Sequence, residues 1–431
     1  MMIPAPQEFL TSPSVFPAPR PGRAIPEDTD TLVTGVAMKA VVWNGTRDVR
    51  TETVPDPEIE QPDDAVIRVT ASGLCGSDLH LYEVLGPFMN QGDILGHEPM
   101  GIVEETGTAV TDLAPGDRVV VPFQISCDQC PMCEVGLQTQ CDNTRVEEQG
   151  MGARLFGYSA LYGSVPGAQA EYLRVPRAQA NAIPVPREGP DDRYVLLSDV
   201  LPTAWQAVAY AGVPRGGTVA VLGLGPIGDM ACRIAQHQGA GQVFGIDPVP
   251  ERRNRVAGWG VEVYDPSEGM DEVIGHIRDR TDGRGPDSVI DAVGMEAAGH
   301  GSAKFAQRVA SFLPKDTAAK MMETAGVDRL SALQSAIDLV RRGGTISLSG
   351  VYGGMVDPLP MLTLFDKQIQ LRMGQANVRH WIPEILPLLD EEDVLGTESF
   401  ASHNVSLDEA ARAYEMFQKK EDNALKVLFR P

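Results

Sequence analysis

The sequence predicts an α/β protein in which a β-rich region precedes a doubly wound parallel sheet. From Met38 to about residue 198, segments such as MKAVVW and AVIRVTASG read as strands broken by Pro and Gly turns. Beyond that point the short apolar segments TVAVL, QVFGID, SVIDAVG and TISLSG alternate with helix-like stretches. This alternation is typical of parallel strands joined by crossover helices.

The composition predicts a multidomain globular protein with a small-molecule partner. A chain of 431 residues is too long for one ordinary core, so we expect two or three domains. Lys and Arg number 36 against 59 Asp and Glu, and the formal charge of −23 repels nucleic acid and anionic membranes. No apolar run approaches the ~20 residues of a membrane helix, and the N-terminus lacks the pattern of a signal peptide. We therefore expect a cytoplasmic protein.

The chain divides into four expected segments. Residues 1–36 form a Pro-rich tail with little apolar periodicity. Residues 38–201 form the first part of the β-rich domain, and residues 202–357 form the parallel-sheet domain, which includes an insertion near 296–329. Residues 358–431 return to the β-rich domain and include the helical stretch SLDEAARAYEMFQ.

A run of four cysteines predicts a structural zinc site. Cys127, Cys130, Cys133 and Cys141 are separated by two, two and seven residues within one short loop. Four thiolates at such spacings complete the tetrahedral coordination of one zinc ion, so the site is closed to substrate. The alternatives are two disulfides within the loop or chance clustering. A closed zinc site prompts the search for a second, open one.

A glycine-rich loop predicts a dinucleotide site. The sequence GLGPIG (Gly223, Gly225, Pro226, Ile227 and Gly228) follows the strand TVAVL and precedes a helical stretch. The glycines allow a tight turn and the close approach of a pyrophosphate, which the free amides of the helix start stabilise. Asp247 ends the second strand, about 20 residues later, where a carboxylate accepts hydrogen bonds from a ribose 2′-OH and repels a 2′-phosphate. This favours NAD over NADP, although Arg252 and Arg253 follow closely and Arg252 is a further candidate cofactor contact.

Candidate ligands of an open metal site are scattered along the β-rich region. Cys75 lies in GLCGSDLH, His97 and Glu98 lie in GHEPMG, and Asp199 lies in LLSDVLPTAW. Taken one at a time, each is equally compatible with a structural role, as a buried thiol, a hydrogen-bonded histidine or a helix cap.

In combination these motifs resemble the zinc-dependent alcohol dehydrogenases of the medium-chain dehydrogenase/reductase family. The segment GHEPMGIVEETGTAV fits the family signature, the cysteine run and GLGPIG follow in the expected order, and the resemblance extends from Met38 to Pro431. It implies a GroES-like catalytic domain and a Rossmann domain. The contexts LLSDVLPTAW and DAVGMEAAGHG resemble the branch of glutathione-independent formaldehyde dehydrogenase and formaldehyde dismutase.

The resemblance implies a role for each matching residue. Cys75, His97 and Asp199 would bind the catalytic zinc, and Asp199 replaces the second cysteine found in many members. Glu98 would lie near the metal, and Asp78 would orient His97. Ser77 would take the substrate proton and pass it toward His80, Thr203 would touch the nicotinamide ring, and Lys426 would approach the cofactor phosphates. The family also implies a homodimer or homotetramer built through the nucleotide-binding domains.

These parts predict an enzyme that holds two Zn²⁺ per chain and uses NAD. Zinc in an open site acts as a Lewis acid on the oxygen of an alcohol or a hydrated aldehyde, and NAD accepts the hydride. We therefore expect oxidation of a primary alcohol or a formaldehyde-like hydrate. The alternatives are a polyol or threonine-type dehydrogenase of the same architecture, a non-catalytic NAD-binding regulatory protein, and a nucleic-acid-binding zinc module, which the acidic charge opposes.

Overall fold

The computed structural model describes residues 37–293, 330–352, 359–390 and 393–431. The expected tail at 1–36 and the expected insertion near 296–329 lie outside the described residues. Within the described part of the chain, no helix combines the length and apolar character required to cross a lipid bilayer.

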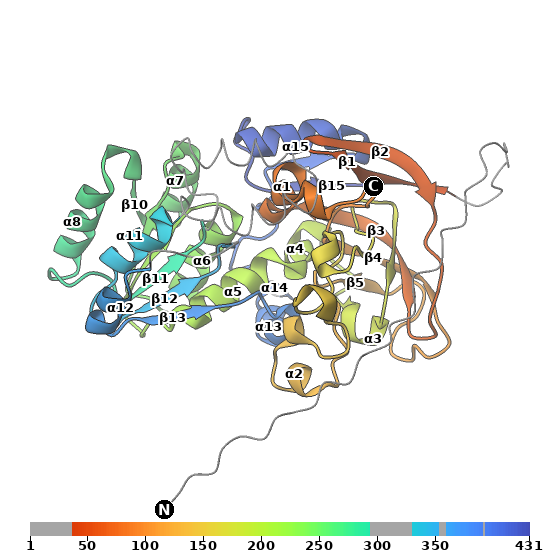
Figure 1. Cartoon of the computed structure of the whole chain (residues 1–431), viewed down its shortest axis with the longest axis horizontal. Coiled ribbons are helices and arrows are strands. Elements are labelled where there is room, and N and C mark those ends of the chain that lie inside the picture. The colour runs from red at the N-terminus through yellow and green to blue at the C-terminus, as the bar shows by residue number, and fades with distance from the viewer. Residues whose placement is uncertain (1–36, 294–329, 353–358, 391–392) are drawn as a thin grey trace, which may run out of the picture. The chain divides into compact units, whose positions relative to one another are not determined.

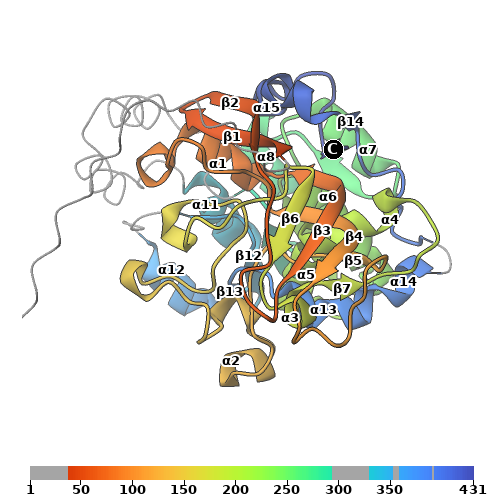
Figure 2. The same cartoon turned by 90° about the vertical axis from the view of Figure 1, so that its right-hand side faces the viewer.

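The first large sheet has seven strands and is mostly antiparallel. Its order is β14-β15-β3-β4-β5-β7, and β6 also pairs with β3. Figure 2 shows β3, β4 and β5 side by side, with β6 beside β3. The strands are β3 (Ala65–Leu74), β4 (Glu98–Thr106), β5 (Arg118–Val120), β6 (Tyr172–Val175), β7 (Ile183–Pro184), β14 (His403–Val405) and β15 (Val427–Phe429). Because β15 pairs with β3, the C-terminal segment returns to the first domain, and Val427 lies opposite Leu74 beside the predicted metal ligand Cys75. A separate hairpin contains β1 (Ala37–Gly45) and β2 (Asp48–Pro55).

The second large sheet is parallel and has six strands in the order β10-β9-β8-β11-β12-β13. The strands are β8 (Thr218–Leu222), β9 (Gln242–Ile246), β10 (Glu262–Tyr264), β11 (Ser288–Asp291), β12 (Thr345–Leu348) and β13 (Gln370–Met373). The strand order reverses between β8 and β11, as in a doubly wound nucleotide-binding sheet. The expected fold class is therefore confirmed. The sheet extends to Met373, beyond residue 357, because β13 adds an edge strand to β12.

The helices reflect local sequence signals. Pro226 and Pro250 open α6 and α7, where the missing amide proton costs nothing, and Gly212 closes α5 in the left-handed conformation at φ +59°. The helices are α1 (Gly76–Glu83), α2 (Pro131–Glu134), α3 (Ala178–Asn181), α4 (Asp191–Val195), α5 (Val200–Ala211), α6 (Pro226–His237), α7 (Pro250–Ala257), α8 (Met270–Arg280), α11 (Ser331–Leu339), α12 (Met361–Lys367), α13 (Val378–Ile385), α14 (Pro387–Asp390) and α15 (Ala410–Lys419).

Helix α5 connects the two sheets. It begins directly after Asp199 and packs against α6, α13 and strand β12 (Figure 1). Nine of its twelve residues are buried, among them Leu201, Trp205 and Val208, which belong to an apolar core shared with residues of both sheets. A residue at the start of α5 is therefore held by the packing of the whole helix rather than by a loop.

Candidate metal and dinucleotide site

The four loop cysteines converge as the sequence predicts. The side chains of Cys127, Cys130, Cys133 and Cys141 are buried, and their sulfurs lie within 4.8 Å of one another. The Sγ–Sγ distances are 4.0 Å from Cys127 to Cys133 and 3.9 Å from Cys130 to Cys141. A tetrahedral site with zinc–sulfur bonds of about 2.3 Å requires sulfurs about 3.8 Å apart, whereas a disulfide requires about 2.05 Å. The sulfurs therefore fit zinc and form no disulfide.

Backbone and side-chain donors surround these sulfurs. Asp142 N donates to Cys130 Sγ at 3.4 Å, and Asn143 Nδ2 donates to Cys127 Sγ at 3.2 Å. Desolvation opposes ionisation of Cys130, but the amides of Cys133 and Asp142 outweigh it and lower the pKa of this thiol to about 6. Thiolates bind zinc, so the local amides favour the binding form of this cysteine.

A second cluster forms where three distant segments meet. It consists of Cys75, His97, Glu98 and Asp199, whose ligand atoms lie within 4.8 Å of one another. Cys75 is the N-cap residue of α1, His97 and Glu98 form the entry to β4, and Asp199 is the N-cap residue of α5. Cys75 Sγ lies 3.4 Å from Asp199 Oδ2, and His97 Nε2 lies 3.6 Å from the same oxygen. The cluster therefore offers one thiol, one imidazole and two carboxylates.

A carboxylate behind His97 fixes its ring. Asp78 Oδ1 lies 3.3 Å from His97 Nδ1, and Asp78 Oδ2 accepts hydrogen bonds from Cys75 N at 2.9 Å and Gln169 Nε2 at 3.3 Å. Gln169 in turn accepts a 2.8 Å bond from Tyr414 OH. With its Nδ1 side occupied by Asp78, His97 directs Nε2 at the cluster, which is the arrangement that orients histidine ligands in metal sites.

The electrostatics of the cluster favour a cation among its acidic groups. Burial raises the pKa of the Cys75 thiol to about 12, and the charges of Asp199 and Glu98 add to this effect. Burial opposes protonation of His97, but Asp78 and Asp199 outweigh it and raise its pKa well above the ordinary value. Burial also opposes ionisation of Asp199, yet the His97 hydrogen bond and charge lower its pKa to about 2. The positive charges beside these carboxylates are a proton on His97 and the ammonium group of Lys426, which pairs with Glu98.

The side chain of Glu98 also suits a cation site. Its side chain is 1% exposed, and within the described part of the chain its Oε1 has no hydrogen-bond partner. Its Oε2 pairs with Nζ of Lys426, which is fully buried and also donates to Leu74 O at 3.1 Å. A buried, half-satisfied carboxylate beside a thiol and an imidazole fits a zinc site.

The remaining residues predicted from the family take the following places. Ser77 Oγ lies 3.0 Å from His97 Nε2, so the hydroxyl borders the cluster. Thr203 Oγ1 donates to Asp199 Oδ1 at 2.8 Å. His80 lies three residues after Ser77 on α1 and is half-buried. Lys426 contacts Glu98, as described above, a contact that the sequence did not reveal.

The glycine loop lies between β8 and α6, as predicted. Gly223 has φ +82°, and a Cβ at Gly228 would collide with the carbonyl oxygen of Gly223, so both positions require glycine. Gly225 is the N-cap residue of α6, and Pro226 and Ile227 form its first turn. The free amides at this helix start suit a pyrophosphate.

Asp247 and Arg252 lie against this loop. Asp247 follows β9 and is 2% exposed; its carboxylate accepts bonds from Leu224 N and Val249 N, both at 2.7 Å. Arg252 Nη1 lies 3.8 Å from Asp247 Oδ2. A carboxylate has about four lone-pair sites, so Asp247 keeps acceptor capacity for a ribose.

Two zinc sites and a glycine loop at the switch point of a parallel sheet define a zinc- and NAD(P)-linked oxidoreductase. Comparison with known families agrees: residues 61–187 match the alcohol dehydrogenase GroES-like domain, and residues 226–304 match the zinc-binding dehydrogenase domain. An uncharacterized zinc-type alcohol dehydrogenase-like protein of Bacillus subtilis, AdhB, is 39% identical over 91% of this chain and 100% of its own length.

Two further proteins are similar to this chain over most of their length. The solved structure of alcohol dehydrogenase TADH from Thermus sp. ATN1 is 34% identical in sequence, with a TM-score of 0.75, over 91% of this chain and 99% of its own. The formaldehyde dismutase of Pseudomonas putida is 33% identical over 88% of this chain and 95% of its own length. The chain belongs to the zinc-dependent alcohol dehydrogenases of the medium-chain dehydrogenase/reductase family.

Proposed function

We propose that this enzyme oxidises a primary alcohol or a small hydrated aldehyde, formaldehyde-like in size, and transfers the hydride to NAD. The cluster of Cys75, His97, Glu98 and Asp199 carries the proposal, because it supplies a cation site with thiolate, imidazole and carboxylate ligands. The likeness to a formaldehyde dismutase supports the substrate class.

Aromatic side chains near the cluster support a small substrate. The His97 ring lies 6.5 Å from Phe123 and 6.4 Å from Tyr158, both edge-on, and Tyr158 lies 5.6 Å from Tyr162. Burial raises the pKa of Tyr158 above its ordinary range, so this phenol stays protonated and can donate a hydrogen bond. We expect these rings to limit the substrate to a few carbons, which argues against a polyol.

Each residue of the cluster has a proposed task. Cys75, His97 and Asp199 hold a zinc ion, and Glu98 borders it, paired with Lys426. When bound, zinc supplies Lewis-acid stabilisation of negative charge on the substrate oxygen. Ser77 accepts the hydroxyl proton and passes it toward His80 on the same helix. Asp78 keeps the His97 ring in place during turnover.

The cofactor is held by the second domain. We propose that Gly223, Gly225, Pro226, Ile227 and Gly228 receive the pyrophosphate, and that Asp247 accepts the adenosine ribose hydroxyls. Arg252, next to Asp247, contacts the same ribose. When bound, NAD supplies the hydride acceptor. The family resemblance also implies that Thr203 contacts the nicotinamide and Lys426 the cofactor phosphates. In this structure the two side chains contact Asp199 and Glu98 of the metal cluster instead.

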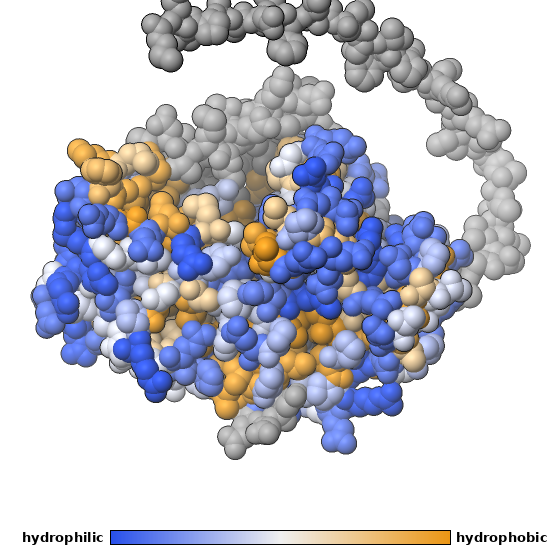
Figure 3. Space-filling model, turned by 90° about the horizontal axis from the view of Figure 1, so that it is seen from below, coloured by the Kyte–Doolittle hydropathy of each residue, from blue (hydrophilic) through white to orange (hydrophobic). Residues whose placement is uncertain are grey.

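We further propose that a second copy of the chain covers the edge of the parallel sheet. Strand β13 is the sheet's last strand, and Met373 on it is 61% exposed. On the neighbouring helix α12, Met361, Leu362 and Phe365 are 63%, 79% and 81% exposed, and Figure 3 shows this apolar patch at its upper left. Two such edges can pair about a twofold axis, which explains the apolar surface.

The double variant Leu362→Asp with Phe365→Asp tests this pairing. It should yield monomers in analytical ultracentrifugation, and an unchanged sedimentation coefficient would contradict the pairing.

The test of the function combines zinc content with a substrate panel. Asp199→Ala should lower zinc from about two to about one per chain and remove most NADH formation from formaldehyde and short alcohols. Asp199→Cys is the matched control, because a thiolate restores a ligand at the same position, and it should keep about two zinc ions. Unchanged zinc content and rate in Asp199→Ala would refute the ligand assignment. Faster turnover of sorbitol than of formaldehyde in the unaltered enzyme would refute the substrate class alone.

A further inference from the structure

A cavity of about 610 Å³ on the parallel-sheet domain has a strongly basic lining. Its charged residues are four arginines, one lysine and one carboxylate: Arg278, Arg284, Arg341, Arg342, Lys367 and Asp287. In the chain as a whole, acidic residues outnumber basic ones by 59 to 36, so this local excess of cations runs against the composition.

The cavity is separate from the proposed cofactor site. Arg284 and Asp287 precede β11, and Arg341 and Arg342 precede β12, so the cavity lies at the amino ends of these parallel strands. The glycine loop follows the carboxyl end of β8, which runs parallel to β11. The two sites therefore lie at opposite ends of the strands of this sheet.

Three of the arginines have carboxylate partners, and two of these pairs are exposed. Arg341 Nε lies 2.7 Å from Asp287 Oδ1. Arg342 lies 2.9 Å from Asp366 and Arg284 lies 3.1 Å from Asp282, but the two arginine side chains are 66% and 67% exposed. Exposed ion pairs contribute little to stability, so these guanidinium groups can turn to a bound anion at little cost.

The other two cations have no carboxylate within ion-pair distance among the described residues. Arg278 Nη2 donates to Asp338 O at 2.9 Å, and Lys367 Nζ donates to Ile337 O at 2.5 Å. Partial burial lowers the pKa of Lys367 below its ordinary value, and the nearby Arg278 guanidinium lowers it further. An anion in the cavity would relieve this repulsion.

These contacts also cap the carboxyl end of α11, which is a structural role. That role accounts for Arg278 and Lys367 but not for Arg284 and Arg342, which line the same cavity from two other loops. Separate segments of the chain therefore converge on one basic cavity.

We propose that this cavity binds a small phosphorylated anion. Guanidinium groups match phosphate oxygens with paired N–H donors, and the lysine adds a point charge. The volume lies within the 300–1,000 Å³ typical of small-ligand pockets. The formal charge of −23 opposes a long nucleic acid, because most of its phosphates would lie outside the basic cavity.

The probe is inorganic tripolyphosphate, titrated by calorimetry into the zinc-loaded full chain with saturating NADH. NADH occupies the glycine loop, so any remaining site is distinct from it. Tripolyphosphate also coordinates zinc, so only the binding that is lost in the cavity variants described next is assigned to the cavity. We expect one equivalent of tripolyphosphate to bind, more weakly as NaCl increases, since salt screens the attraction. Absence of binding at millimolar tripolyphosphate would overturn the proposal, as would tighter binding of a single-stranded oligonucleotide than of tripolyphosphate.

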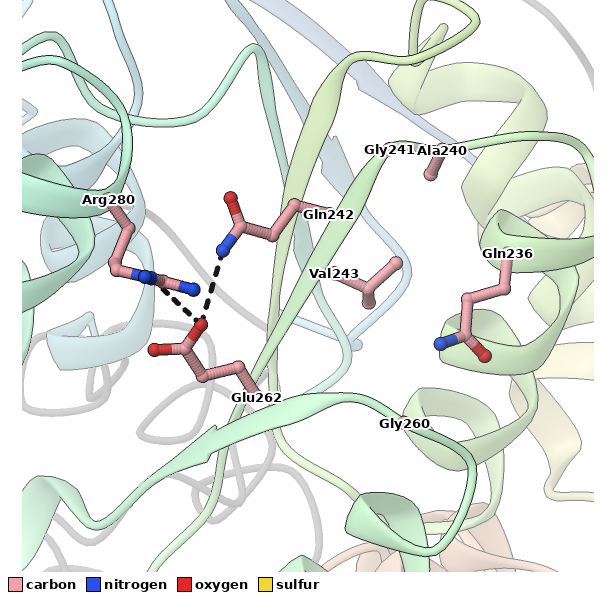
Figure 4. A pocket seen from close by; sticks show the side chains of 8 residues that line it. All are labelled: Gln236, Ala240, Gly241, Gln242, Val243, Gly260, Glu262 and Arg280. Carbon is pink, nitrogen blue, oxygen red and sulfur yellow. Dashed lines mark hydrogen bonds and ion pairs between the residues drawn. The ribbon is translucent and has the colours of Figure 1, made fainter.

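Charge-matched variants locate the site. Arg284→Gln with Arg342→Gln removes two exposed cavity cations and should weaken tripolyphosphate binding at least tenfold, with unchanged thermal stability. The control is Arg280→Gln with Arg187→Gln, which removes the same charge from exposed ion pairs elsewhere. Arg280 lies on the same helix as Arg278 but lines a different pocket of about 210 Å³, where it pairs with Glu262 (Figure 4). The control should bind within twofold of the unaltered enzyme, and equal weakening of both variants would reduce the effect to general surface charge.

Discussion

Thr203 Oγ1, in the first turn of α5, donates a 2.8 Å hydrogen bond to Oδ1 of Asp199, the N-cap residue of the same helix. The backbone adds a second link, because Thr203 N donates to Asp199 O at 2.9 Å. One carboxylate oxygen is thereby fixed on the helix, while the other, Oδ2, faces Cys75 and His97. Thr203 thus positions a proposed metal ligand from a rigid helix.

Replacing this hydroxyl should loosen the metal site. Thr203→Val keeps the shape but removes the donor, and loss of such outer hydrogen bonds typically lowers metal affinity about 10-fold to 100-fold. We expect zinc affinity at the catalytic site to fall about tenfold in competition with a chelator. Thr203→Ser should restore it. A raised KM for NAD with unaltered zinc affinity would instead assign Thr203 to the nicotinamide.

The cysteine loop is fastened to α13 through Asn377. Asn377 Oδ1 accepts hydrogen bonds from Thr139 N at 3.0 Å and Thr139 Oγ1 at 2.9 Å, and Asn377 N donates to Gln206 Oε1 at 3.0 Å. Thr139 is buried, so Asn377→Ala leaves its two donors unsatisfied, while the backbone bond to Gln206 survives, and it should lower the free energy of unfolding by about 2–4 kcal/mol. Chemical denaturation measures the loss. Asn44→Ala, whose hydrogen bonds are exposed, should stay within about 0.5 kcal/mol of the unaltered protein.

A buried ion cluster joins α6 to the segment near residue 396. Arg233 Nε donates to Asp229 Oδ1 at 2.6 Å and Nη1 donates to Leu395 O at 2.9 Å, while its guanidinium lies 4.2 Å from the Trp259 ring centroid. Arg233→Met should destabilise the protein by about 2–3 kcal/mol, because buried hydrogen bonds of a charged group are lost, while Asp229 keeps Arg255 as its remaining ion-pair partner. Arg280→Met, which breaks an exposed ion pair, should lower the free energy of unfolding by less than about 1 kcal/mol. Urea titration of both variants measures the two losses. Equal losses in the two variants would contradict a special role for burial.

Asp287 should contribute to stability only above acid pH. Partial burial alone raises its pKa, but the Thr218 backbone amide and Arg341 outweigh it and hold the pKa below the ordinary value. A carboxylate with a lowered folded pKa stabilises the protein above its unfolded pKa of about 3.9, and this contribution is lost as the pH falls through the folded pKa.

The measurement compares the melting temperature of Asp287→Asn with that of the unaltered protein at pH 7 and at pH 3. Both samples are metal-free, because acid also releases zinc. We expect a clear deficit at pH 7 that shrinks at pH 3. The exposed Glu148→Gln should show little deficit at either pH. A deficit as large at pH 3 as at pH 7 would show that the Asp287 interactions do not depend on its charge.

The sequence by itself determined the features that depend on neighbours along the chain. The cysteine run brings four thiols together within one loop, and GLGPIG sets its own turn between a strand and a helix. The alternation of short strands and helices likewise specified the parallel sheet, because side-chain period and element length are local properties.

Only the tertiary structure decided how distant segments meet. Asp199 lies 124 residues from Cys75, and without the family resemblance the sequence could not bring them to 3.4 Å. The pairing of Glu98 with Lys426, 328 residues apart, depends on β15 adding to β3. The basic cavity combines α8, α12 and the loops before β11 and β12, which carry no shared motif. Strand pairing and core packing set such distances, because they are chosen by burial over the whole chain rather than by local sequence.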